Sequence, residues 1–371
     1  MSKYIISCLV FCIWFCADAA TGADTLCRKN NSRALGINLR PSAIIPTHGF
    51  YKGWNPESRP LRVGGSVDLQ YMFSTCSHAA YQGAGAGVHT FFADRMLGTP
   101  VTFYIFQGAP LARISPALTF GYEWNLGISA NWRDNGTVTV SPVNVYINVA
   151  CLFNWRLDDR WSLCFGPGYT HFSNGDTMFP NGGANTVNFR IGTKYSFNGL
   201  SHSEIEPVFE SDALELKPSE RMTYDLTVAG GWRADRQIIG GRLEISNRPF
   251  AIASVSFNPL YHFNDYFSVG PALDLTYDAS ANREYGKSFA YRSAAGISAR
   301  AELKMPVFGV NVGFGYNVLH KGPDLSGVYG IFNLKAFLSK RLYLSVSYRL
   351  SSVMYSHNML FGAGWRFGNI R

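Results

Sequence analysis

Residues 143–157 read VNVYINVACLFNWRL, and in this stretch every second side chain is apolar. The odd positions carry the apolar set, which is Val143, Val145, Ile147, Val149, Cys151, Phe153, Trp155 and Leu157. The even positions form a largely polar face, which includes Asn144, Asn148, Asn154 and Arg156. Because successive side chains of a β-strand point to opposite faces, this alternation predicts a strand with one oily and one polar side.

The alternation recurs in Phe308–Val318, where glycines and asparagines lie opposite the apolar face. In residues 289–304 the second face carries Arg292, Arg300, Glu302 and Lys304. A soluble sandwich would turn that face to an apolar core, so charges there argue against one. The pattern therefore predicts an all-β fold, an antiparallel transmembrane β-barrel with lipid outside and a polar lumen.

Up to sixteen segments between residues 34 and 367 follow this pattern, and most exceed the roughly 9 to 11 residues that a tilted strand needs to cross the hydrocarbon. If the strands alternate up and down, the tight connections fall on one side, as in outer-membrane barrels; they include GAPLAR (108–113), LDDR (157–160), FNDY (263–266) and LSKR (338–341). A long acidic connection at 199–220 has eight segments on each side. We expect one barrel of about 14 to 16 strands, with two eight-stranded barrels as the alternative.

The N-terminal segment contains one lysine, followed by an apolar run from Tyr4 to Cys16 and then by Ala17-Asp18-Ala19. This order is typical of a secretory signal peptide with a small-residue cleavage site. The predicted domains are a signal peptide over 1–19 and a barrel over 20–371. No other apolar stretch approaches the roughly 20 residues of a transmembrane helix. The expected location is the cell outer membrane of a Gram-negative bacterium.

Four cysteines remain after cleavage, and they are too few and too far apart for a disulfide scaffold or a zinc site. A disulfide between Cys27 and Cys76, both on the expected periplasmic side, is left open. Cys151 and Cys164 point to opposite faces and should not pair. The formal net charge of +8 favours anionic partners such as outer-membrane lipids, whereas scattered basic residues and export argue against nucleic acid.

The stretch GYTHFSNGDTMFPNGGAN, residues 168–185, places a histidine and a serine two residues apart before a turn. In the strand from Trp161 to Ser173 the odd positions form the lipid-facing set, so His171 and Ser173 are expected on the outer wall. This strand leaves a periplasmic turn, so its end should lie at the outer-leaflet interface. Two such side chains lie within about 7 Å, which lets an imidazole take a proton from a hydroxyl once the backbone bends.

The next strand, 185–197, turns its own odd positions outward, so Asn185 is expected beside His171. There its amide can orient the imidazole ring, which is the role of the third member of a Ser-His triad. The backbone N–H groups of Asn174 and Gly175 are the nearest donors for an oxyanion hole.

The motif HFSN, followed by a P-N-x-G turn and a final strand, resembles the lipid A 3-O-deacylases of the PagL type, the acyloxyacyl hydrolase family of outer-membrane serine esterases. The specific match covers about Gly168 to Tyr195, within a PagL-like part of about 34–198; C-terminal strands follow over about 220–367. The resemblance implies His171 as base, Ser173 as nucleophile and Asn174 in the oxyanion hole. Asn185 stands where the family has a glutamate, and Asp176 where it has a glycine.

The function expected from these residues is an outer-membrane esterase that removes an ester-linked acyl chain from lipid A of lipopolysaccharide. Two alternatives stay open: a phospholipase with the same residues, and a porin-like barrel without enzymatic activity. No metal or organic cofactor is implied. The expected partners are lipopolysaccharide and other outer-membrane lipids, and a homodimer is left open.

Overall fold

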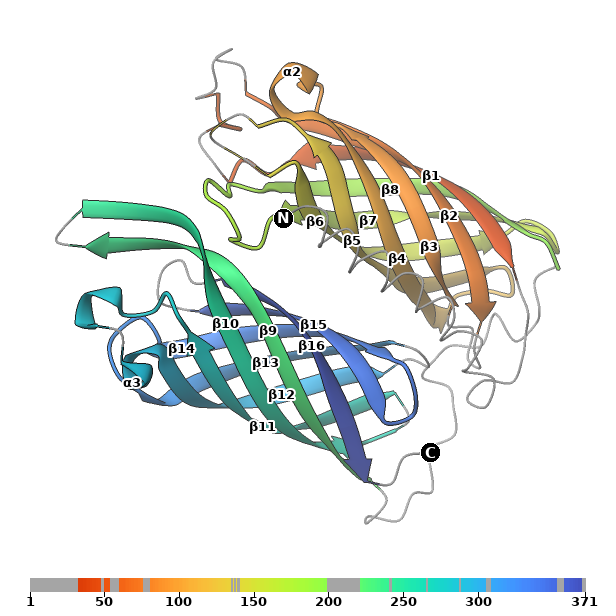
Figure 1. Ribbon diagram of the computed structural model, residues 1–371. Coiled ribbons are helices and arrows are strands. Elements are labelled where there is room, and N and C mark those ends of the chain that lie inside the picture. Colours follow the sequence, from red (N-terminus) through yellow and green to blue (C-terminus); the bar gives the residue numbers. More distant parts are fainter. Residues whose placement is uncertain are drawn as a thin grey trace. The chain divides into compact units, whose positions relative to one another are not determined.

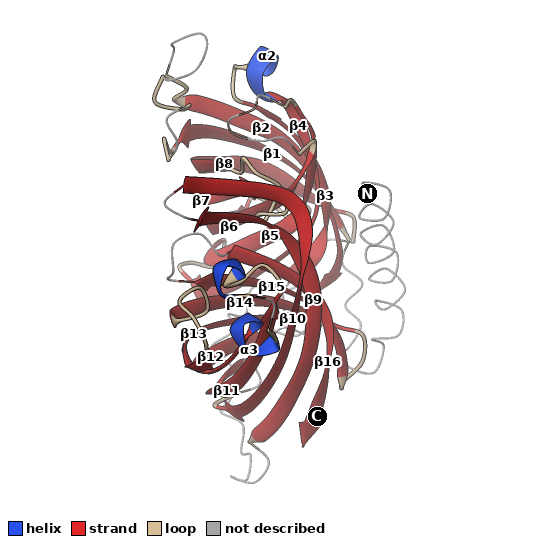
Figure 2. Cartoon of the chain, turned by 60° about the vertical axis from the view of Figure 1, so that its left-hand side comes forward, coloured by secondary structure: helices blue, strands red, loops and turns tan. Residues whose placement is uncertain are grey.

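Alternating side chains produce β-strands along the whole described chain. The computed structural model describes residues 33–47, 50–53, 60–75, 81–134, 136, 138, 141–198, 221–239, 242–264, 266–286, 288–304, 308–351 and 357–368. Within these residues sixteen strands form two closed antiparallel barrels of eight strands each (Figure 1). The helices of the described residues are short and lie in connections between strands (Figure 2).

The first barrel contains eight strands in chain order, and its last strand pairs with its first. The strands are β1 (Ala34–Ile44), β2 (Val63–Thr75), β3 (Tyr81–Thr90), β4 (Gly98–Arg113), β5 (Leu118–Trp132), β6 (Val143–Arg156), β7 (Trp161–Ser173) and β8 (Ala184–Ser196). The closing register sets Ala34 opposite Ser196. A one-turn helix, α2 (Asp94–Leu97), lies between β3 and β4.

The second barrel repeats this arrangement and closes through a pairing of β16 with β9. Its strands are β9 (Met222–Ile239), β10 (Arg242–His262), β11 (Phe267–Asp278), β12 (Ser293–Lys304), β13 (Phe308–His320), β14 (Gly327–Phe337), β15 (Leu342–Ser351) and β16 (His357–Gly368). The β9–β10 hairpin extends beyond its neighbours (Figure 1), and its register shifts between Ser246 and Phe250. The 3-10 turn η6 (Arg283–Tyr285) and the helix α3 (Phe289–Arg292) connect β11 to β12.

The expectation of a single barrel of 14 to 16 strands is wrong, and the alternative of two eight-stranded barrels is confirmed. The alternation itself contains no information on closure, because a strand has the same inward and outward faces in either architecture. Closure is decided by edge pairing, which joins β8 to β1 and β16 to β9. The signal peptide and the 199–220 segment lie outside the described residues.

Both barrels turn apolar side chains outward and polar ones inward. In β6, Val149 is 48% exposed while its neighbour Asn148 is 1% exposed. In β13, Val312 and Phe314 are exposed while Asn311 is fully buried. This polarity is the reverse of a soluble protein's and is that of a barrel surrounded by lipid.

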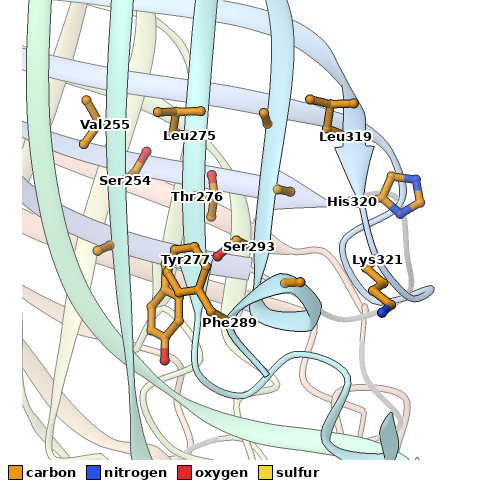
Figure 3. A pocket seen from close by; sticks show the side chains of 14 residues that line it. Ser254, Val255, Leu275, Thr276, Tyr277, Phe289, Ser293, Leu319, His320 and Lys321 are labelled. Carbon is orange, nitrogen blue, oxygen red and sulfur yellow. The ribbon is translucent and has the colours of Figure 1, made fainter. Parts of the chain in front are cut away.

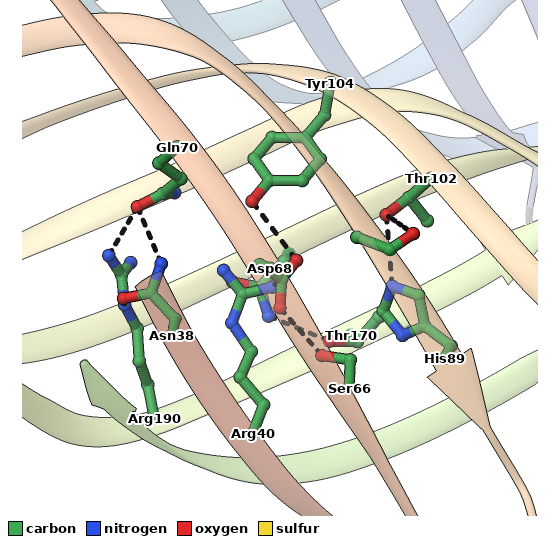
Figure 4. A network of polar contacts seen from close by, with 12 residues as sticks. Asn38, Arg40, Ser66, Asp68, Gln70, His89, Thr102, Tyr104, Thr170 and Arg190 are labelled. Atoms are coloured by element: carbon green, nitrogen blue, oxygen red, sulfur yellow. Dashed lines mark hydrogen bonds and ion pairs between the residues drawn. The ribbon is translucent and has the colours of Figure 1, made fainter. Parts of the chain in front are cut away.

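Ion pairs lie in the interior of the first barrel, and Figure 4 shows that of Arg40 with Asp68. Arg40 Nη1 lies 2.9 Å from Asp68 Oδ1, and Arg190 Nη1 lies 2.5 Å from Glu123 Oε1. Gln70 joins the second pair, since its Nε2 donates to Glu123 at 2.8 Å and its Oε1 accepts from Arg190 at 2.6 Å. Such mutual pairing compensates the large desolvation cost of each buried charge.

The second barrel contains its own four-charge cluster. Arg366 Nε lies 2.6 Å from Asp225 Oδ1, and Arg366 Nη2 lies 2.5 Å from Glu302 Oε1. Lys335 Nζ contacts both carboxylates, at 2.6 Å from Asp225 Oδ2. All four side chains are almost completely buried. Since eight strands enclose a space just wide enough for side chains, the described interiors are packed and leave no wide channel among these residues.

The two ends of each barrel differ. Short turns at 157–160, 263–266 and 338–341 lie at one end, as the sequence predicted, whereas GAPLAR belongs to β4 and the chain turns after it, at 114–117. In the 157–160 turn, N–H groups of Arg160 and Trp161 donate to Asp158 and lower the pKa of its carboxyl. The longer connections, β3–β4 and β7–β8 in the first barrel and β11–β12 in the second, lie at the other end of their barrel. Among the described residues, no helix has the length and apolar character that crossing a bilayer would require.

Candidate functional site

The candidate site lies where β7 ends, at the end of the first barrel that carries the longer connections. The odd positions of β7 face outward: Trp161, Pro167 and Tyr169 are exposed, and His171 is half-buried. Ser173, the last residue of the strand, is only 7% exposed. Parity places His171 and Ser173 on the outer side, whereas their neighbour Phe172 packs inward against Trp132 and Tyr146. The serine is therefore buried beneath the 174–183 turn, which the parity argument did not foresee.

His171 and Asn185 lie directly opposite each other in the β7–β8 pairing. The ring Nδ1 of His171 is 2.7 Å from Asn185 Oδ1. The same oxygen accepts a hydrogen bond from the Tyr169 hydroxyl at 2.6 Å, while Asn185 Nδ2 donates to Thr47 Oγ1 at 3.3 Å. Because the amide oxygen can only accept, Nδ1 carries the proton and the opposite nitrogen, Nε2, is left with a lone pair. That is the tautomer a general base requires.

The hydroxyl of Ser173 is held by the turn that follows it. The N–H of Gly175 donates to Ser173 Oγ at 3.0 Å, and Asn181 Nδ2 donates to the same oxygen at 3.0 Å. The N–H of Asn174 donates to Asn181 Oδ1 at 3.2 Å, which is itself 3.4 Å from Ser173 Oγ. The two predicted oxyanion donors thus lie beside the serine, one bonded to its oxygen and the other to Asn181.

The turn takes this shape through a few residues in unusual backbone conformations. Gly175 and Gly183 have φ of 66° and 59°, and Asp176 has φ of 59°. Asp is among the few residues that tolerate this left-handed region, so it can replace a glycine there. Its carboxylate accepts from Asn181 Nδ2 at 2.8 Å, which fixes the asparagine that contacts Ser173. The buried Tyr51 donates to Gly183 O at 2.7 Å, and burial raises the pKa of this tyrosine.

Sequence reasoning missed three contacts of this site. The hydroxyl of Tyr169 contacts Asn185, and the outward parity of this tyrosine alone does not indicate that contact. Thr47 reaches Asn185 from the β1–β2 connection, and nothing local in the sequence indicates this. Asn181 belongs to the P-N-x-G turn, and an amide at a turn beside a serine was a signal that could have been used.

Other candidate groups lie elsewhere. The described part of the chain contains no cluster of three or more His, Cys, Asp or Glu side chains that could hold a metal. Cys151 is exposed and Cys164 is buried, and both are free thiols, as their opposite faces predicted. Cys27 and Cys76 lie outside the described residues.

The closed barrels, apolar outside and polar inside, define an outer-membrane type of β-barrel protein. Residues 222–369 match the family model described as "Acyloxyacyl hydrolase, C-terminal domain", PagL_C. This match confirms the resemblance to the PagL-type family and points to a bacterial outer-membrane protein of the acyloxyacyl hydrolase type. It lies in the second barrel, whereas the sequence motif that suggested the family lies in the first.

Similar solved structures are other outer-membrane proteins. The FrpB iron transporter from Neisseria meningitidis is 10% identical, with 91% of this chain and 71% of that chain covered and a TM-score of 0.23. Omp33 from Acinetobacter baumannii is 9% identical, with 92% and 100% covered and a TM-score of 0.17. Scores this low carry no argument. No protein in the curated set matches this sequence.

The histidine and serine motif occurs once in the chain. The histidines of the family-matched segment are His262, His320 and His357, and none has a serine two residues later. In the second barrel Leu350 takes the corresponding outward position near the end of the second-to-last strand, and the register pairs it with His357. The two barrels therefore share a fold but differ in the side chains that a Ser-His mechanism requires.

Proposed function

We propose that the first barrel is a serine esterase that removes an ester-linked acyl chain from lipid A at the outer-leaflet interface. The observation that carries the proposal is the Nδ1 contact of His171 with Asn185 at 2.7 Å, two residues before Ser173. This contact favours the imidazole tautomer that can take a proton from a hydroxyl.

The reaction begins when Ser173 Oγ leaves its hydrogen bonds with Asn181 and turns toward His171. Nε2 of the imidazole takes the hydroxyl proton while Oγ bonds to the ester carbonyl carbon. The carbonyl oxygen becomes an oxyanion, and N–H groups of the turn, those of Asn174 and Gly175, are the nearest donors to it. Collapse breaks the ester C–O bond, and the imidazolium returns its proton to the departing hydroxyl of the lipid.

Hydrolysis of the acyl-serine completes the cycle. His171 takes a proton from water, the resulting hydroxide attacks the acyl carbon, and the proton returns to Ser173 as the fatty acid leaves. Asn185 holds the ring in place through both steps but carries no charge. A neutral amide stabilises the imidazolium less than a carboxylate does, so we expect slower turnover than in a barrel with a glutamate at this position.

The location of the site supports a lipid substrate. Tyr169 and His171 lie on the outward side of β7, near the end with the longer connections, where head groups and ester linkages meet the wall. A half-buried imidazole on a lipid-facing wall costs free energy, so its presence there favours a functional role. The packed ion pairs of both interiors do not favour the porin-like alternative.

The test is the lipid A profile of cells that express the full chain, measured by mass spectrometry. The wild type should release one acyl chain, and Ser173→Ala should restore the intact profile. The matched control is Ser351→Ala, a serine at the end of β15 in the second barrel, which should behave as wild type. Acyl loss from phospholipids alone would establish the phospholipase alternative, and unchanged activity of Ser173→Ala would refute serine chemistry.

A further inference from the structure

A groove of about 580 Å³ lies on the outer wall of the second barrel, near the end that carries the longer connections. Strands β10, β11 and β12 form its floor, and α3 and the end of β13 border it (Figure 3). Its lining is apolar, with Val255, Leu275 and Leu319 among the contributing side chains. The volume is within the range of about 300 to 1,000 Å³ that small-molecule sites occupy.

The groove exists because two kinds of residue meet there. Ala253 and Ala295 stand at outward positions, where much of the wall carries larger side chains, so the floor is low. Phe289 of α3 is 72% exposed and stacks on Tyr277, with ring centroids 5.7 Å apart and planes 17° from parallel. The stacked rings of Phe289 and Tyr277 thus form one side of the groove, next to a floor of small residues.

A cation lies at one end of the groove. Lys321 is exposed, and its Nζ lies 4.5 Å from the centroid of the Tyr291 ring. No ion pair joins Lys321 to a carboxylate among the described residues; the nearby Asp324 accepts from the N–H of Asn282 at 2.6 Å. His320, whose Nδ1 is 3.1 Å from Gly322 O, borders the same end. The charge of Lys321 is therefore available to an anionic group above an apolar groove.

We infer that this groove binds one acyl chain of lipid A, with Lys321 paired to a phosphate of the head group. An apolar slot with a cation at its end complements a phosphorylated amphiphile. The short turns of this barrel lie at its opposite end, so the groove faces the outer leaflet, where lipid A resides. The second barrel binds this lipid without cleaving it, since it lacks a His-x-Ser motif. The inference concerns binding alone and does not require hydrolysis by the first barrel.

The experiment uses the full chain with Ser173→Ala, purified in detergent and analysed by native mass spectrometry for retained lipid. Ala295→Trp should fill the groove and lower retention of lipid A by about tenfold, because the pocket is lost. Lys321→Ala should lower retention by about tenfold through loss of one charge-assisted contact. Adding lipid A to the delipidated parent protein should restore the bound species.

Two matched controls separate the groove from general lipid contact. Val328→Trp adds the same bulk to the outer wall at the start of β14, and Lys340→Ala removes a lysine from the turn after β14. Both should retain lipid A as the parent does. Folding of every variant is checked by the electrophoretic mobility of the unheated protein. Equal retention in groove variants and controls would overturn the inference. A retained phospholipid in place of lipid A would overturn it as well.

Discussion

The two barrels differ at a pair of residues that lie opposite each other near the end of their last two strands. In the first barrel this pair is His171 and Asn185, joined by a hydrogen bond and followed by Ser173. In the second barrel the register pairs Leu350, an exposed apolar residue, with position 357. Both barrels have eight strands and a buried ion-pair cluster. The comparison teaches that the fold can be kept while the side chains for chemistry are present in only one copy.

The family match sharpens this contrast, because it falls on the barrel without the motif. A family model responds to the whole pattern of strands and turns, so it can match a barrel that lacks reactive side chains. Chemistry must therefore be located by geometry, which here favours the first barrel.

The largest effect expected is that of His171→Ala on hydrolysis. Removing the base should lower kcat by about 10⁶-fold, as loss of the histidine of a Ser-His triad does. The measurement is acyl release from lipid A by purified protein, with folding checked by gel mobility. His262→Ala, at the end of β10 in the second barrel, is the control and should retain full activity. A large loss of acyl release in the control variant alone would indicate that the active site lies in the second barrel.

The second prediction asks whether each barrel depends on its own interior. Glu302→Gln leaves Lys335 and Arg366 with one carboxylate, Asp225, and should destabilise the second barrel by about 3 to 5 kcal/mol. Hydrogen exchange in increasing urea, read from peptides of each barrel, should show earlier loss of protection in β9–β16 only.

The reciprocal variant is Glu123→Gln, which removes the partner of Arg190 and should affect β1–β8 only. Each variant thus serves as the other's control. If either substitution weakened both sets of strands equally, the barrels would unfold as one unit and the comparison of two independent copies would fail.

The third prediction concerns the neutral member of the triad. Asn185→Asp has the same shape and adds a charge that stabilises the imidazolium, so kcat should rise by about tenfold. KM should change little, because the side chain contacts the ring. Asn264→Asp, in the turn after β10, provides an Asn-to-Asp control that should not alter hydrolysis. A lower kcat in Asn185→Asp would mean that Asn185 does not act through the imidazole.

Much of this architecture could be predicted from the sequence, and the rest depends on contacts that the sequence does not encode locally. The period of two revealed the outward and inward faces, as in Val149 and Asn148, because each side chain's direction is a local property of a strand. The number of barrels could not be deduced, since closure rests on pairing Ala34 with Ser196 across the whole barrel. Parity also placed Asn185 opposite His171.

The burial of Ser173 was beyond the parity argument. A strand's alternation says which side a residue faces, but the turn that folds over that side is set by Gly175, Asp176 and Gly183 in left-handed conformations. The contact of Asn181 with the serine follows from that turn and not from any strand. Loops therefore carry the part of the site that the sequence left undetermined.

The smallest effect expected is that of Tyr169→Phe. The substitution removes the hydroxyl that donates to Asn185 Oδ1 at 2.6 Å. A neutral hydrogen bond contributes about 0.5 to 1.5 kcal/mol, which corresponds to a loss in kcat of about two- to thirteenfold. Tyr348→Phe, at an outward position of β15, is the matched control and should be silent. The loss in kcat should be smaller in an Asn185→Asp background. There the carboxylate keeps a charge-assisted hydrogen bond to the Nδ1 proton of His171 even when the tyrosine hydroxyl is removed. If Tyr169→Phe lowered kcat by the same factor in both backgrounds, the hydroxyl would act through a contact with the barrel wall or the lipid and not through residue 185. The Tyr169 hydroxyl would then not be among the contacts that orient the imidazole, and the first barrel would still differ from the second in His171, Ser173 and Asn185.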